Sequence, residues 1–294
     1  MKKRILALLL ALLLPACALA GTEKLPMDFT GGMKPLDTFR PADMTYEDPS
    51  IRVERFKVKY GENDKYRTGY FYAFIDLADA SQLRTVSANG FDHRGKATVD
   101  VLARRVNAVL AVNGDYFSAR PDSYVLRQGT VYRDAVGADQ DVLLIDEDGD
   151  FHIILASEDP AGADKTQWEG KKIVNAFDFG PALIRNGEKV ADPACAPDQS
   201  TPDEPAQRMA LCQLGPLRYL VVCCDNVLGL TLDELCDLIL DTAGEETVLA
   251  AYNLDGGNSS QMVFLGKKVN NTKYDVNTRQ ITDIVYFASA YAPD

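Results

Sequence analysis

The sequence predicts a single mixed α+β domain with a curved, mainly antiparallel sheet and two principal helices. Many short apolar segments alternate with turn sequences such as Asp148-Gly149 and Asn186-Gly187, which is typical of antiparallel strands. Only two segments have helical spacing. Of the 294 residues, 46% are hydrophobic and 25% are charged, and this ordinary globular composition argues against a coiled coil or a largely disordered chain.

The first twenty residues have the pattern of an export signal. Basic residues at positions 2–4 precede an apolar run at 5–14, and residues 18–20 fit a cleavage site, so 1–20 would be a signal peptide. Residues 14–17 also resemble a bacterial lipobox, in which Cys17 would be acylated. Both alternatives place the mature protein outside the cytoplasm, either secreted or lipid-anchored to the outer face of a bacterial membrane.

The remaining chain divides near residue 51. Residues 21–50 contain four prolines and two adjacent glycines with little periodicity, which predicts a linker or a loosely attached N-terminal arm. From Ile51 apolar and charged residues alternate, so we expect the folded domain over 51–294. The predicted strands, in chain order, are 51–60, 70–77, 83–88, 108–112, 142–145, 151–155, 182–184, 208–213, 219–224, 248–254, 262–265 and 283–288. Residues 125–132 are expected to form a hairpin around Gln128-Gly129.

Two helices complete the prediction. In the first, over 98–107, apolar residues recur at helical spacing. In the second, Thr231 and Glu234 form a T-x-x-E capping box, and Gly244 stands where a left-handed terminating residue is favoured. Between the helices, Cys223 and Cys224 are adjacent in a predicted strand, so their side chains should point to opposite faces.

The charge balance restricts the partners. The formal net charge is −12, and such a surface repels phosphate backbones, which argues against a nucleic-acid partner. One small anion could still bind in a local basic pocket. No cofactor and no metal site are predicted, although the acidic side chains leave a bound divalent cation open. Membrane contact is expected only through a lipid at Cys17.

Polar side chains follow two of the apolar strands. After the strand 108–112 come Asn113, Gly114 and Asp115, and the strand 248–254 runs into a second cluster. Catalytic groups often lie on loops at the ends of buried strands, and consecutive glycines let backbone N–H groups approach an anion. Two simple tight turns remain the alternative. The second cluster consists of Asn253, Asp255, Gly256, Gly257, Ser259 and Ser260.

Taken together and in order, these segments resemble the phosphodiester glycosidase domain family. Residues 111–117 (AVNGDYF) are similar to its A-x-N-G-x-Y/F-F block, and 180–187 are similar to its G-P-x-L-x-x-x-G block. Residues 229–260 resemble its G-L-T-L…N-L-D-G-G-x-S-S signature, and Asn270 fits the asparagine that follows. The family usually has Arg-Thr after the proline-rich loop, whereas here Arg208 is followed by methionine.

The resemblance implies an exported glycosidase that splits a sugar from a phosphodiester, and many bacterial relatives are associated with exopolysaccharide and the cell envelope. This chemistry needs a carboxylate beside the anomeric carbon and a cation for the phosphate. Asp255 is the candidate carboxylate, with Asp115 second, and Arg208 is the candidate phosphate clamp. The expected substrate-binding residues, for a glycan or sugar-phosphodiester partner, are Asn113, Gly114, Asp225, Asn253, Gly256, Gly257, Ser259, Ser260 and Asn270.

Other functions stay open on the sequence alone. The fold could serve as a non-catalytic carbohydrate-binding or cell-envelope polysaccharide assembly module. A metal-dependent phosphodiesterase would cut P–O instead of C–O, but no histidine-rich metal motif is present. A serine hydrolase using Ser259 is the weakest alternative, because there is no G-x-S-x-G motif and only two histidines could act as the base.

Overall fold

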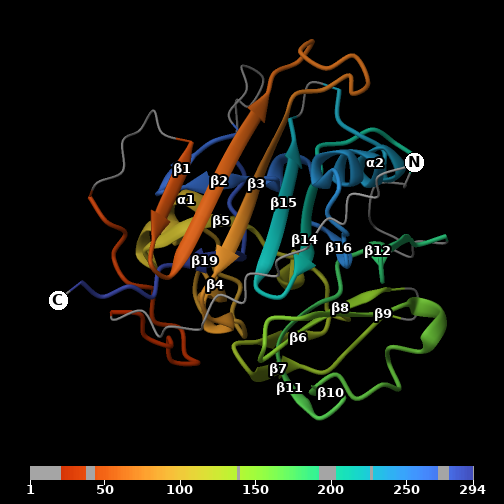
Figure 1. Ribbon diagram of the computed structural model, residues 1–294. Coiled ribbons are helices and arrows are strands. Elements are labelled where there is room, and N and C mark those ends of the chain that lie inside the picture. Colours follow the sequence, from red (N-terminus) through yellow and green to blue (C-terminus); the bar gives the residue numbers. More distant parts are fainter. Residues whose placement is uncertain are drawn as a thin grey trace, which may run out of the picture.

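The computed structural model describes residues 21–37, 44–137, 140–191, 203–225, 228–270 and 278–293. Within these residues the chain forms three antiparallel sheets and two α-helices (Figure 1). The predicted α+β class with mainly antiparallel pairing and two helices is therefore confirmed. The strands are divided among three open sheets and do not form a single curved one, because hairpins from the middle of the chain pair with one another.

The largest sheet has eight strands and runs across the centre of Figure 1. In spatial order they are β1 (Thr45–Asp48), β2 (Ile51–Val58), β3 (Tyr70–Leu77), β15 (Arg218–Cys224), β14 (Met209–Gly215), β16 (Ala250–Leu254), β12 (Ala182–Arg185) and β13 (Glu188–Lys189). The predicted strand 70–77 coincides with β3. The register of β14 with β16 pairs Met209 with Leu254, so the start of one strand lies beside the end of the other.

The second sheet is built from the middle of the chain. Its spatial order is β7 (Thr130–Arg133), β6 (Val125–Arg127), β11 (Lys171–Phe177), β8 (Val142–Asp146) and β9 (Phe151–Ile154), with β10 (Gln167–Trp168) pairing with β11. The β8–β9 hairpin turns at Asp148-Gly149 as predicted. The sequence did not predict β11, because its lysines and Asn175 interrupt the apolar pattern, and its register with β8 shifts at that point.

The third sheet contains β5, the strand that leads into the candidate residues Asn113, Gly114 and Asp115. Its order is β18 (Lys267–Lys268), β17 (Met262–Phe264), β5 (Ala108–Asn113), β19 (Asp283–Ala288) and β4 (Leu83–Ser87). Helix α1 (Val99–Arg105) packs against it, and Val99 and Leu102 share a core cluster with Ile284. Every residue of β5 is buried, because α1 covers one face of the strand and the main core covers the other.

Helix α2 (Leu232–Ala243) covers part of the large sheet (Figure 1). Thr231 Oγ1 accepts the Glu234 N–H at 3.1 Å, and the Glu234 carboxylate accepts the Thr231 N–H at 2.8 Å, which confirms the predicted capping box. Leu235 and Ile239 pack with Val222 of β15. Four short 3₁₀ turns complete the described elements: η1 (Ala80–Gln82), η2 (Phe117–Ala119), η3 (Ala156–Glu158) and η4 (Gly257–Ser259).

The described part of segment 21–50 corrects the expectation of a loosely attached arm. Leu25 is 4% exposed and belongs to a core cluster, and β1 pairs with β2 over four residues. The buried Arg84 side chain donates to the backbone carbonyls of Pro26, Asp28 and Thr30. Proline interrupts the periodicity of a segment without preventing it from packing, so the irregular pattern of residues 21–50 does not indicate loose attachment.

Other expectations concern the N-terminus and the cysteines. The proposed signal segment 1–20, with Cys17, lies outside the described residues, as does Cys195. The described α-helices are too short or too polar to cross a membrane. Cys223 and Cys224 lie in different core clusters on opposite faces of the large sheet, as predicted, and the four cysteines in the described ranges are free.

Candidate active site

The two candidate strand ends meet directly. The Asp255 N–H donates to the Gly114 carbonyl at 3.3 Å, and Asn113 Nδ2 donates to the Asp255 carbonyl at 2.7 Å. Gly114 also donates its N–H to the carbonyl of Asp283. A Cβ on Gly114 would lie 2.2 Å from Asp283 Oδ1, so this approach requires glycine. Two motifs that lie far apart in the chain therefore form one site between β5 and β16.

Asp255 is the carboxyl at the end of β16, and it is 8% exposed. Burial raises its pKa to about 6, and the negative charge of Asp115 contributes to the increase. The neighbouring Ser259 hydroxyl and the positive charge of Arg279 act in the opposite direction. Arg279 is exposed, so the site combines two buried acidic side chains with one solvent-accessible cation.

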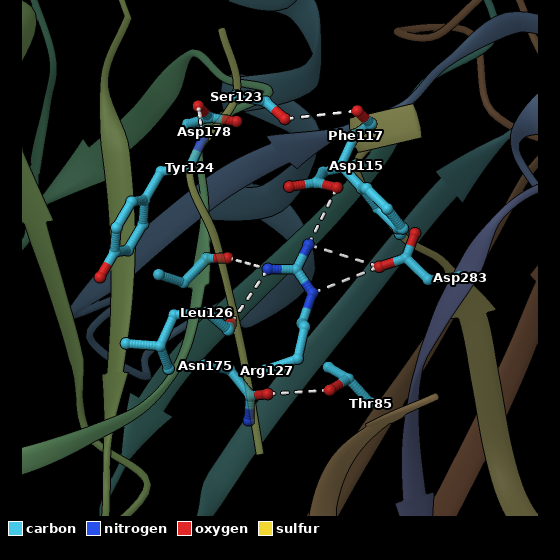
Figure 2. Close-up of polar contacts among 12 residues, drawn as sticks. Thr85, Asp115, Phe117, Ser123, Tyr124, Leu126, Arg127, Asn175, Asp178 and Asp283 are labelled. Carbon is cyan, nitrogen blue, oxygen red and sulfur yellow. Dashed lines mark hydrogen bonds and ion pairs between the residues drawn. The ribbon is translucent and has the colours of Figure 1, made fainter. Parts of the chain in front are cut away.

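Asp115 forms an ion pair with the buried Arg127 (Figure 2). Arg127, at the end of β6, lies with Nη2 2.9 Å from Asp115 Oδ1 and with Nε 3.3 Å from Asp283 Oδ2. Its guanidinium also lies 4.2 Å from the ring centroid of Phe177, and it donates to the carbonyls of Leu126 and Ala176. Asp115 Oδ2 is buried and has no hydrogen-bond partner among the described residues.

A further carboxyl closes this polar cluster. Asp178 follows β11 and accepts the Tyr124 N–H at 2.6 Å (Figure 2). It also lies 3.2 Å from Arg120 Nη2. Burial raises the pKa of Asp178 to about 7, and it raises the pKa of Asp283 to about 7 as well. In both cases the negative charge of Asp115 contributes to the rise. The carboxyls around Asp115 consequently titrate far above the usual range of aspartate.

The two candidate asparagines have different contacts. Asn253 Nδ2 donates to the Gly180 carbonyl at 2.7 Å, and its buried Oδ1 has no partner in the described structure. Asn270 Nδ2 donates to the Ser260 carbonyl at 2.8 Å, and its Oδ1 accepts the Met262 N–H. Asn270 therefore fixes the turn into β17, whereas Asn253 is fixed through its Nδ2 alone.

The glycine-rich turn is held by its own backbone. Gly257 has a φ of +57° and donates its N–H to the Gln207 carbonyl at 2.7 Å, and a Cβ on Gly256 would lie 2.7 Å from the same oxygen. The N–H groups of Ser259 and Ser260 donate to the carbonyls of Gly256 and Gly257. These three N–H groups do not form the anion-binding nest that the sequence suggested. The glycines instead let the turn pack closely against residue 207.

Arg208 and Asp225 lie near the same end of the sheet. The register of β14 with β16 places the Arg208 backbone beside Asp255, as expected for strands of one sheet. The Arg208 guanidinium donates to the carbonyls of Glu204 at 2.8 Å and Leu230 at 3.1 Å. Asp225 Oδ1 accepts the Thr68 hydroxyl at 2.7 Å. The positive charge of Arg279 acts on Asp255, and the clamp role of Arg208 stays a prediction.

Sequence reasoning missed several residues of the cluster: Arg120, Arg127, Asp178, Arg279 and Asp283. Asp178 carried a usable signal, because it follows the apolar residues 176–177 and precedes Gly180-Pro181, the same strand-end pattern that identified Asp115. Arg127 and Asp283 stand at strand ends within apolar sequence. No local pattern pairs them, because their contact depends on two sheets packing together.

Across the described ranges, no cluster of three or more histidine, cysteine, aspartate or glutamate side chains is arranged to hold a metal ion. The carboxyls of Asp115, Asp178 and Asp283 instead face arginine side chains.

Glycoside hydrolases use a pair of aspartate or glutamate carboxyls at the scissile bond, and Asp115 and Asp255 are the candidate pair here. The chain belongs to the phosphodiester glycosidase family, whose model matches residues 106–288. The resemblance found in the sequence is thereby confirmed, and it includes both candidate strand ends. No curated protein sequence matched the chain.

Solved structures share this fold. The catalytic domain of zebrafish N-acetylglucosamine-1-phosphodiester alpha-N-acetylglucosaminidase, auto-inhibited by its pro-peptide, aligns with a TM-score of 0.63 at 18% identity. The alignment covers 85% of this chain and 87% of the zebrafish domain. A hypothetical protein from Synechocystis aligns with a TM-score of 0.55 at 14% identity, over 81% of this chain and 62% of that one. At these identities the similarity establishes the fold.

Proposed function

We propose that this protein is an exported hydrolase that cleaves the bond between the anomeric carbon of a sugar and a phosphodiester. The observation that carries the proposal is the meeting of β5 and β16, which brings Asp255 close enough to Asp115 for one charge to raise the pKa of the other. Family membership supports the reaction class. The zebrafish enzyme with the same fold is named for a sugar-1-phosphodiester substrate.

The side chains suggest a division of roles. The ionised Asp255 carboxylate stabilises the positive charge that develops at the anomeric carbon. Among the carboxyls of the cluster it is the most exposed, and the hydrogen bond from its N–H to the Gly114 carbonyl fixes its backbone. Asp115 is fully buried and held by Arg127, and it supplies a fixed negative charge beside Asp255. Arg279, whose charge acts on Asp255, and Arg208, whose backbone lies beside Asp255, are the candidate cations for the phosphate.

The predicted export signal indicates which substrates the protein would encounter. A protein outside the cytoplasm would meet phosphodiester-linked glycans of the cell envelope or exopolysaccharide, and we propose these as its substrates. The acidic chain carries a formal net charge of −12, so an anionic substrate needs a local cation for its phosphate.

Substitution of Asp255 tests the assignment. Asp255→Asn keeps the size of the side chain and removes its charge, so turnover of a panel of sugar-1-phosphodiesters should fall by about a hundredfold or more while the thermal midpoint is kept. Asp233→Asn, on the exposed face of α2, is the matched control and should leave turnover unchanged. Near-normal turnover by Asp255→Asn would end the proposed role. Saturable glycan binding without turnover by the unmodified protein would favour the binding-module alternative.

A further inference from the structure

Residues 26–30, which we call the clasp, wrap around the buried side chain of Arg84 on β4. Arg84 Nη1 donates to the Pro26 carbonyl at 3.0 Å. Its Nη2 donates to the Asp28 and Thr30 carbonyls at 2.8 and 3.1 Å. Arg84 is 1% exposed, and hydrogen bonds from a charged donor are stronger than those between neutral groups. The guanidinium therefore fastens an irregular loop to the third sheet.

The chain on either side of the clasp is fastened to the end of the same sheet. Before the clasp, the Glu23 N–H donates to the Ala290 carbonyl at 2.9 Å. After it, the Met33 N–H donates to the Ser289 carbonyl at 2.9 Å. Both carbonyls belong to residues that directly follow β19. The position of the clasp relative to the third sheet is thus fixed at both of its ends.

The other side of the clasp contacts the hairpin formed by β6 and β7. Gln128 Nε2, in the turn of this hairpin, donates to the Asp28 carbonyl at 2.8 Å. The ring centroid of Phe29 lies 6.3 Å from that of Tyr132 on β7, and 5.5 Å from that of Phe91, which follows β4. The clasp therefore joins the third sheet to a hairpin of the second sheet.

That hairpin also supplies the arginine of the candidate active site. Arg127 immediately precedes Gln128, and its Nη2 lies 2.9 Å from Asp115 Oδ1. The Gln128 N–H donates to Asn175 Oδ1 at 3.1 Å. The same oxygen accepts the Thr85 hydroxyl at 2.9 Å (Figure 2). Adjacent residues of one hairpin are therefore held by the carboxyl cluster and by the clasp, so a shift of the turn would displace the Arg127 guanidinium.

We propose that the clasp positions the β6–β7 hairpin so that Arg127 meets Asp115. The Phe29 ring and the Asp28 carbonyl are the contacts that hold the hairpin. Phe29 is a positioning residue in this arrangement, because it acts on the candidate active site through Arg127. The clasp follows soon after the predicted signal cleavage at residue 20, so trimming of the exported chain past residue 30 would release the hairpin.

Hydrogen exchange tests the clasp without requiring any activity. Phe29→Ala removes the ring contact with Tyr132, so amides in residues 124–133 should exchange about threefold to tenfold faster, the scale of one aromatic contact. Phe56→Ala is the matched control, because both phenylalanines are 38% exposed and the Phe56 ring stacks 4.8 Å from that of Tyr72. This control should leave residues 124–133 unchanged. Unchanged exchange in Phe29→Ala, or equal acceleration by both variants, would overturn the proposal.

Two conservative variants separate the clasp from a general loss of packing. Phe29→Tyr keeps the ring and should retain the slow exchange of residues 124–133. Gln128→Asn shortens the side chain and removes its bond to the Asp28 carbonyl, while asparagine suits the φ of +47° at this position. This variant should speed exchange in the same residues as Phe29→Ala. Fast exchange in Phe29→Tyr, or normal exchange in Gln128→Asn, would contradict the proposed contacts.

A double-mutant cycle tests whether the clasp acts through Arg127. Arg127→Lys keeps the buried charge but lacks the planar fork that contacts Asp115 and Asp283. In this background Phe29→Ala should cost less stability in urea than it does in the unmodified protein, because the two side chains hold one hairpin. Phe56→Ala should cost the same in both backgrounds. Additive costs for Phe29→Ala and Arg127→Lys would overturn the link to the candidate active site.

A kinetic test rests on the proposed function. If the protein hydrolyses a sugar-1-phosphodiester, Phe29→Ala should move the acid limb of kcat/KM to higher pH, and Phe29→Tyr should not. The reason is that a displaced Arg127 offsets less of the Asp115 charge, which adds to burial in raising the pKa of Asp255. An unchanged profile in Phe29→Ala would overturn the positioning role. Absence of turnover would count against the proposed function, while the exchange and cycle results still decide on the clasp.

Discussion

The two strand ends that meet at the candidate site have similar sequences and different surroundings. Asp115, at the end of β5, is fully buried and lies 2.9 Å from the buried Arg127. Asp255, at the end of β16, keeps 8% exposure and has the solvent-exposed Arg279 as its cation. The first carboxyl is fixed by permanent charged partners, whereas the second can be reached from outside.

This difference shows how one pattern can serve two purposes. A carboxyl locked against an arginine provides a fixed charge and a fixed position, and a less tightly held carboxyl nearby can react with a substrate. If the comparison is right, damage to the Asp115 side should mainly cost stability. Damage to the Asp255 side should mainly cost activity.

The largest stability effect is expected at Arg127. Arg127→Met removes the cation between two buried carboxyls, so the free energy of unfolding in urea should fall by about 3–5 kcal/mol. Adding Asp115→Asn to this variant removes one of the two stranded charges and should restore part of the loss. A loss of less than about 1 kcal/mol in the single variant would show that Asp115 is not held in this way.

The paired asparagines sharpen the comparison. Asn113 donates to the carbonyls of Gly114 and Asp255 and accepts the Gln261 N–H, whereas the Asn253 side chain makes one bond, to Gly180. Asn113→Ala should therefore destabilise the protein by about 2–3 kcal/mol and Asn253→Ala by about 1 kcal/mol. Urea unfolding of both variants measures the difference, and the reverse order would contradict the account of the β5 end.

The pH dependence of stability tests the buried cluster. Because the pKa of Asp283 rises to about 7 on folding, the folded state favours its protonated form, and the associated stability is lost as the pH rises from about 4 to 7. The slope is about 1.4 kcal/mol per pH unit for one such group. Asp283→Asn cannot titrate, so its unfolding free energy should fall less than that of the unmodified protein between pH 5 and 7. Parallel curves would mean that Asp283 is ionised throughout.

The mildest expected effect is the pH profile of activity. If the ionised Asp255 is required, kcat/KM should fall as the pH drops below about 6, the pKa to which burial raises this carboxyl. Turnover measured from pH 4.5 to 8 gives the profile. A loss of activity above pH 6 instead would assign Asp255 as a proton donor.

Local patterns predicted most of the elements and the two strand ends. The capping box at Thr231 and Glu234, the β8–β9 turn and the strands 70–77 and 283–288 depend on neighbouring residues, so the sequence alone could locate them. The division into three sheets could not be predicted, because it depends on which distant strands pair.

The contacts that fix Asp115 could not be predicted from the sequence for the same reason. Arg127 meets Asp115 and Asp283 only after the second and third sheets pack together, and no spacing in the sequence records that contact. For Arg208, the sequence predicted the position of the backbone but not the partners of the side chain. Its backbone lies beside Asp255 as the strand order predicted, but its guanidinium has carbonyl partners on Glu204 and Leu230, which strand pairing cannot specify.

The position of bond cleavage tests the central claim most directly. A sugar-1-phosphodiester that the protein hydrolyses would be incubated with it in water enriched in oxygen-18, and both products would be analysed by mass spectrometry. Attack at the anomeric carbon, which the placement of Asp255 and Asp115 predicts, puts the heavy oxygen in the released sugar. Heavy oxygen in the phosphate product would show P–O cleavage and contradict the assignment of a glycosidase.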